Sequence, residues 1–181
     1  MKENKKERYS ISIPDLAIRY LAVLCLGLNS LFIIYYLFTP ITFYPVYFIL
    51  NLFYNASLSG TAILIGSTKI EIIKACVAGS AIYLLIILNL TTKMNCAKRL
   101  ASLAYSIACL LILNIARIVI LSVMLINNFA LFDITHKIFW YVLSTIFVVV
   151  IWFSEVKLFK IKNIPVYSDI KSIMKIIGKD K

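Results

Sequence analysis

The chain changes character at Lys74-Ala75-Cys76-Val77-Ala78-Gly79-Ser80. A short segment in which apolar residues alternate with polar ones ends here, and an uncharged run begins that continues to Thr92. Alternation is typical of a β-strand, whereas an uncharged apolar run of this length is typical of a membrane helix. We therefore expect Cys76 to lie at the start of a helix, at the membrane surface.

The composition also indicates an integral membrane protein of one domain. Hydrophobic residues make up 62% of the 181 residues. A small domain has too large a surface-to-volume ratio to hide that much apolar surface from water. The first apolar run is long enough to span rather than to be cleaved as a secretory signal. The four cysteines show neither metal-ligand nor disulfide-framework spacing, so no metal is expected.

The net charge of +11 comes largely from Lys and Arg near the two ends of the chain and in one short loop. This distribution is typical of the cytoplasmic parts of a membrane protein and not of a nucleic-acid groove, so no nucleic-acid partner is expected. Residues 157–181 are interpreted as a basic cytoplasmic tail that follows a membrane-embedded domain at 1–156. The tail fits an amphipathic helix on the membrane surface and a solvated terminal segment equally well.

The order of apolar and charged segments predicts an all-α, polytopic helix bundle of about four transmembrane helices. These helices are expected at 18–38, 75–92, 100–126 and 138–154. Thr39-Pro40 is expected to end the first of them. Residues 61–72 alternate around Gly66-Ser67 and predict a short external β-hairpin.

The segment 41–58 is apolar and aromatic but is interrupted by proline and asparagine. Lys93, Lys98 and Arg99 place the next loop, which also holds Cys96, in the cytoplasm. With a cytoplasmic N-terminus, only an odd number of crossings can then precede Cys76. We therefore expect segment 41–58 to be interfacial or re-entrant rather than a further crossing.

Three side chains with chemistry are expected to converge on the external side. Cys76 begins one helix, His136 begins the last one, and Arg117 interrupts the apolar run between them. A thiol at a helix N-terminus beside an imidazole that takes its proton makes a nucleophile. A guanidinium inside an apolar run needs a partner or a role, and when fixed it can stabilise a developing oxyanion. Asn114, one turn earlier on the same face, is expected to hold Arg117.

Each of these residues also has a purely structural explanation. Cys76 can be a small buried apolar residue, and His136 can be an interfacial side chain. Arg117 can form an ion pair with Asp133, with Glu71 or with a lipid phosphate. Asp133 is expected to cap the last helix or to orient the ring of His136, with capping the favoured role.

These residues resemble those of the exosortase and archaeosortase family of membrane transpeptidases. The resemblance rests on Glu71-Ile72-Ile73-Lys74-Ala75-Cys76-Val77-Ala78-Gly79-Ser80, on Asn114-Ile115-Ala116-Arg117-Ile118 and on His136, and it covers about residues 59–154. It implies that Cys76, Arg117 and His136 are the nucleophile, the electrostatic stabiliser and the proton-transfer group. The short N-terminal part favours a compact archaeosortase-like branch.

The resemblance implies a multi-pass enzyme of the cell membrane whose active site faces the extracytoplasmic side. Such an enzyme cleaves the C-terminal sorting signals of secreted proteins through a thioester and transfers them to an amine, with a membrane lipid as the expected acceptor. The partners would be secreted proteins with a sorting motif, a transmembrane helix and a basic end. Neither a metal nor a nucleotide cofactor is implied.

Two other classes stay open. An intramembrane cysteine hydrolase would use the same three residues but pass the thioester to water. A non-catalytic membrane subunit or transporter component would use Arg117 only as a structural charge.

Overall fold

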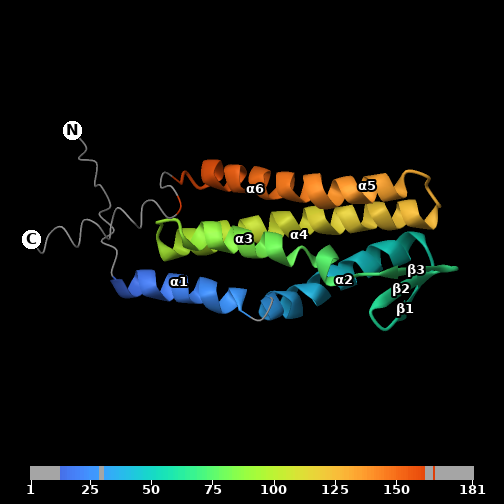
Figure 1. The fold of residues 1–181 in the computed structure, drawn as a ribbon, viewed down its shortest axis with the longest axis horizontal. Helices are drawn as coiled ribbons and strands as arrows, with labels where there is room; N and C mark the ends of the chain where they lie inside the picture. The colour runs from blue at the N-terminus through green and yellow to red at the C-terminus, as the bar shows by residue number, and fades with distance from the viewer. Residues whose placement is uncertain (1–12, 29–30, 162–164, 166–181) are drawn as a thin grey trace, which may run out of the picture.

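The computed structural model describes residues 13–28, 31–161 and 165. The helices run along the long axis of an elongated bundle, and a small sheet lies at one end (Figure 1). The helical elements are α1 (Ile13–Gly27), α2 (Phe32–Phe53), the 3-10 helix η2 (Lys74–Val77), α3 (Gly79–Leu90), α4 (Cys96–Ile126), α5 (Phe132–Ile138), the π-helix η3 (Phe139–Leu143) and α6 (Ser144–Leu158). The end with the sheet is called the sheet end. The opposite end, with the loop between α3 and α4, is called the basic end (Figure 1).

Three helices are long and apolar enough to cross a membrane. They are Phe32–Phe53, Cys96–Ile126 and the continuous run Phe132–Leu158, and two shorter apolar helices cover Leu16–Gly27 and Lys74–Leu90. Many large apolar side chains on these helices are exposed, as a bilayer solvent allows. The mostly helical fold with long apolar helices indicates a membrane protein.

The expected first crossing at 18–38 is wrong, because the helix breaks inside it. α1 ends at Gly27, where the ring of Tyr83 approaches so closely that a Cβ atom would lie 2.4 Å from its hydroxyl oxygen. That hydroxyl donates a hydrogen bond to the carbonyl of Val23 at 3.0 Å. After the break, Leu31 has a left-handed backbone with φ 61°, and α2 begins. α1 and α2 follow one another toward the sheet end (Figure 1).

The proline after Thr39 does not end a helix, contrary to expectation. α2 continues through Pro40 and Pro45 to Phe53. The Thr39 hydroxyl donates to the carbonyl of Tyr35 at 2.6 Å, and membrane helices tolerate proline where neighbouring helices pack on them. Residues 41–53 therefore belong to a helix of membrane-spanning length and not to a separate interfacial or re-entrant segment.

The sheet has three strands, one more than the pattern at 61–72 predicted. They are β1 (Ala56–Ser59), β2 (Ala62–Ile65) and β3 (Thr68–Glu71), antiparallel in the order β1-β2-β3. Each connection is a two-residue turn that opens with a glycine at positive φ, Gly60 at 62° and Gly66 at 57°, as a type II′ turn requires. Buried sheet residues pack on α2 and α4 in one cluster: Val46, Leu50, Ile63, Ile65, Ile70, Ile72 and Ile118.

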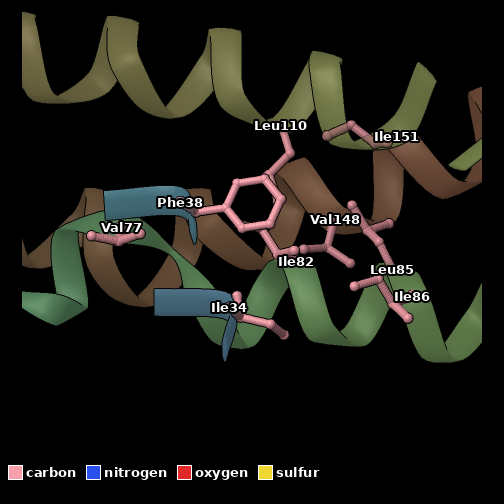
Figure 2. Close-up of a cluster of buried hydrophobic side chains, with 9 residues drawn as sticks. All are labelled: Ile34, Phe38, Val77, Ile82, Leu85, Ile86, Leu110, Val148 and Ile151. Carbon is pink, nitrogen blue, oxygen red and sulfur yellow. The ribbon is translucent and has the colours of Figure 1, made fainter. Parts of the chain in front are cut away.

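A second apolar cluster holds α2, α3, α4 and α6 together. Figure 2 shows its members: Ile34, Phe38, Val77, Ile82, Leu85, Ile86, Leu110, Val148 and Ile151. The ring of Phe38 reaches from α2 in among side chains of the other helices (Figure 2). Inside a bilayer, close packing of this kind is a main source of helix association, because lipid is as apolar as the side chains.

A buried polar cluster joins α3, α4 and α6 near the basic end. The side chain of Glu155 is fully buried and accepts a hydrogen bond from Asn89 Nδ2 at 2.9 Å and another from the Ser106 hydroxyl. Asn89 Nδ2 also donates to Ser102 Oγ at 2.7 Å. The sequence-based interpretation ended the last crossing at 154, so this carboxyl group was missed.

Two helix boundaries differ from those expected. α4 begins at Cys96 rather than at residue 100, because the Asn95 side chain caps it by accepting from the Lys98 amide at 3.1 Å. Cys96 is therefore a helical residue and not a loop residue. The last helical run begins at Phe132 rather than at 138. The amphipathic helix considered for the tail falls largely on residues 162–164 and 166–181, outside the described residues.

Candidate active site

Cys76, Arg117 and His136 line one cavity of about 140 Å³ at the sheet end. They come from three separate elements, η2, α4 and α5. The remaining walls are the edge of the sheet at 69–72, apolar side chains of α4 and the aromatic rings of Phe132, Phe139 and Trp140. The three residues selected from the sequence are thus brought to a common space.

Contrary to expectation, Cys76 does not lie in the first turn of a long helix. Ala78, with φ 57° and ψ 34°, separates the 3-10 helix η2 from α3, and Cys76 lies in η2. Gly79 opens α3 against α2, where a Cβ atom would lie 2.6 Å from the ring of Tyr35. This contact leaves no room for a larger residue at the junction. The dipole of α3 is therefore displaced from the thiol by the turn at Ala78.

The backbone around Cys76 is held by two hydrogen bonds. Its amide donates to the carbonyl of Ile73 at 2.8 Å, and its carbonyl accepts from Asn114 Nδ2 at 2.8 Å. Asn114 is almost completely buried on α4. The expectation that Asn114 holds Arg117 is therefore wrong: it ties η2 to α4 instead. The Cys76 side chain is half-buried and faces the cavity.

Arg117 is anchored by a hydroxyl group and not by a carboxylate. Its Nη1 donates to Ser144 Oγ at 2.7 Å. Its buried Nε has no hydrogen-bond partner among the described residues. Among the described residues, no ion pair joins Arg117 to Asp133 or Glu71. The guanidinium instead faces the cavity that Cys76 also lines.

His136 lies in the second turn of α5 and not at the start of a helix. Its ring is half-buried between two aromatic rings on the same helix face, with centroid distances of 5.6 Å to Phe132 and 6.0 Å to Trp140. Asp133 lies in the first turn of α5 and not at its N-cap, which is Leu131. No hydrogen bond links Asp133 to His136 in the structure of residues 31–161. Packing between the rings, rather than a carboxylate, therefore fixes the imidazole.

A π-helical turn follows His136 and was not predicted. It covers Phe139–Leu143 and ends beside Ser144, whose hydroxyl donates to the carbonyl of Phe139 at 3.0 Å while accepting from Arg117. The backbone N–H of Ser144 also donates to the Phe139 carbonyl, which is the i to i+5 bond of the π-turn, and single π-turns are common at functional sites. Ser144 is thus a site residue that sequence reasoning missed. Its only signal is a hydroxyl in an apolar run.

Together these groups supply the parts of an acyl-transfer site. A thiol, a fixed cation and an imidazole meet in a half-enclosed, largely apolar cavity, where electrostatic stabilisation is stronger than in water. A guanidinium keeps its proton under ordinary conditions, so the help it can give to such a reaction is electrostatic. No family model, curated protein or solved structure matches this chain.

Proposed function

We propose that this protein is a membrane-embedded cysteine transpeptidase of the exosortase and archaeosortase kind. The observation that carries the proposal is that Cys76, Arg117 and His136, from three different elements, line the same cavity. A thiol, a guanidinium and an imidazole that served only structural purposes would have no reason to share one space. The resemblance of the motifs around these residues supports the same chemistry.

The reaction proceeds in two balanced steps. The Cys76 sulfur attacks the carbonyl carbon of a substrate amide, the carbon–nitrogen bond breaks, and the leaving amine takes up the thiol proton through His136. Arg117 stabilises the negative charge that develops on the carbonyl oxygen. An acceptor amine then attacks the thioester, gives up a proton, and restores the Cys76 thiol.

The substrate in this proposal is a secreted protein with a C-terminal sorting signal and a membrane helix, and the acceptor is an amine on a membrane lipid. Lys93, Lys98 and Arg99 lie at the basic end, which we assign to the cytoplasm by the positive-inside rule. The cavity then faces the extracytoplasmic side. In this arrangement α1 and α2 together make one passage, and α3, α4 and the run α5–α6 make three more.

The test compares host cells that carry the wild-type protein with cells that carry Cys76→Ser or Cys76→Ala at equal membrane abundance. The serine variant keeps the shape of the side chain but carries a hydroxyl too weakly acidic to be activated in the same way. Mass spectrometry of the C-terminal peptides of membrane and secreted proteins is the readout. We expect a subset of these proteins to lose the C-terminal helix only in wild-type cells.

Undiminished helix removal in both variants would contradict the proposal. The mass of the new C-terminus separates the two enzyme classes, because an amine adduct indicates transfer and a free carboxylate indicates hydrolysis. If no protein is processed in any strain, the site is not a peptide-cleaving enzyme under those conditions, and the transpeptidase assignment fails.

A further inference from the structure

One wall of the cavity is the edge of a strand and not its face. Three consecutive residues of β3, 69–71, and the residue that follows the strand, Ile72, line the cavity. Successive side chains of a strand point to opposite faces, so consecutive residues can share one space only along the edge. β3 is the outermost strand in the order β1-β2-β3, so this edge has no neighbouring strand among the described residues.

The register identifies which backbone groups face the cavity. Ile65 and Thr68 are opposite each other across the two-residue turn and form a hydrogen-bonded pair. Hydrogen-bonded and non-hydrogen-bonded pairs alternate, so Thr68 and Ile70 bond to β2. The N–H and C=O groups of Lys69 and Glu71 therefore point away from the sheet. No backbone group elsewhere in residues 31–161 forms a hydrogen bond with them.

The side chains of β3 fix the edge by packing and protect it from pairing with another sheet. Ile70 is buried in the cluster that packs the sheet on α2 and α4. Lys69 and Glu71 are more than half exposed, with a nitrogen–oxygen distance of 3.7 Å between them. Short edge strands with charged side chains are protected against pairing with a second copy of the same sheet. The edge is thus held by packing, has no neighbouring strand among the described residues and borders the cavity.

We propose that β3 is a docking edge for the substrate, which binds as an added strand. An extended peptide supplies backbone partners for the outward N–H and C=O groups of Lys69 and Glu71, and its side chains alternate between the face of the sheet that packs on α4 and the opposite face. β3 leads through Ile72 and Ile73 to Cys76, so a peptide on this edge passes the thiol. The use of Cys76 in catalysis rests on the proposed function, but the docking edge does not.

The test measures how fast Cys76 of the purified protein in nanodiscs is alkylated by two probes. One is an acetylated alanine tetrapeptide chloromethyl ketone, and the other is the same reagent with a single alanine. In both cases the thiolate displaces chloride and forms a thioether. Each rate is divided by the rate with iodoacetamide, which needs no docking. We expect the tetrapeptide to react about tenfold faster, the effect of one or two backbone hydrogen bonds.

Lys69→Pro removes an outward N–H without touching the bonds between β2 and β3, and should bring the two probe rates together. Leu58→Pro is the matched control. It makes the same change on the other edge of the sheet, along β1. The backbone N–H and C=O of Leu58 also point away from β2, but Leu58 does not line the cavity. Leu58→Pro should keep the tenfold advantage.

A third arm leaves the protein unchanged. N-methylation of alternate amides in the tetrapeptide removes the donors of the probe, and should abolish its advantage on the wild-type protein. This arm decides the question if the iodoacetamide rate shows that Lys69→Pro has misfolded. Equal rates for both probes on the wild type, or an advantage that survives both Lys69→Pro and N-methylation, would overturn the proposal.

The docking edge and the proposed function can fail separately. An edge-dependent advantage of the peptide probe, in a protein whose host shows no processed substrate, would keep the docking edge and reject the transpeptidase. Normal processing of host substrates by Lys69→Pro would keep the transpeptidase and reject the docking edge.

Discussion

Replacing Glu155 by alanine should destabilise the bundle much more than replacing it by glutamine. In the wild type the buried carboxyl group accepts from Asn89 and from Ser106, and so links α3, α4 and α6. Alanine removes both acceptor oxygens and leaves a space behind. Asn89 Nδ2 keeps its bond to Ser102. The groups left without a partner are therefore the Ser106 hydroxyl and the N–H of Asn89 Nδ2 that pointed to Glu155.

The size of the effect follows from these contacts. A buried polar group without a partner costs about 1–3 kcal/mol, and a buried large-to-small substitution adds a cavity term, so Glu155→Ala should cost about 2–5 kcal/mol in total. Glutamine fills the same space. Its carbonyl accepts one bond, and the Ser106 hydroxyl can reverse its direction to accept from the new amide. We therefore expect Glu155→Gln to cost less than about 1 kcal/mol.

The measurement is the free energy of unfolding in mixed micelles, titrated with a denaturing detergent, together with the thermal midpoint. For a chain of this size a loss of about 2–5 kcal/mol corresponds to a fall in Tm of roughly 5–15 °C. Both variants should keep their helical circular-dichroism signal before unfolding. Equal stability of Glu155→Ala and the wild type would refute the argument that this cluster holds the helices together.

Three further predictions concern the site. Ser144→Ala should lower substrate processing about 10- to 100-fold by releasing Arg117, whereas Ser144→Thr keeps the hydroxyl and should retain most activity; equal activity of both would exclude this anchor. Arg117→Lys should not restore function at equal membrane abundance, because lysine lacks the planar fork, and near-normal processing would indicate a merely structural cation. In intact cells a membrane-impermeant thiol reagent should label Cys76 but not Cys96, and stronger labelling of Cys96 would reverse the orientation.

Patterns that depend on local chemistry were read well from the sequence. The apolar composition predicted a membrane protein, and the alternation at 61–72 fell on residues that form strands in the structure. Cys76, Arg117 and His136 stood out because a bilayer tolerates such side chains only for a reason, and they line one cavity. Their catalytic roles stay predictions.

Features that depend on tertiary contacts were not readable. A proline usually marks the end of a helix, but α2 continues through Pro40 and packs on neighbouring helices. The residue in close contact with Gly27, where α1 ends, is a tyrosine 56 positions later in the chain. Neither the π-helical turn nor the burial of Glu155 leaves a periodic signal, because each is decided by partners on other helices.

The shortness of the segment that carries Cys76 has a consequence for the surrounding lipid. The apolar run Lys74–Leu90, with the left-handed turn at Ala78 inside it, has fewer than the roughly 20 residues that a transmembrane helix needs, whereas the 31 residues of α4 extend about 46 Å. In the orientation proposed above, such a hydrophobic mismatch would thin the bilayer on the side of η2 and α3. We therefore expect the acyl-chain length of the surrounding lipid to change the access of substrates to the cavity.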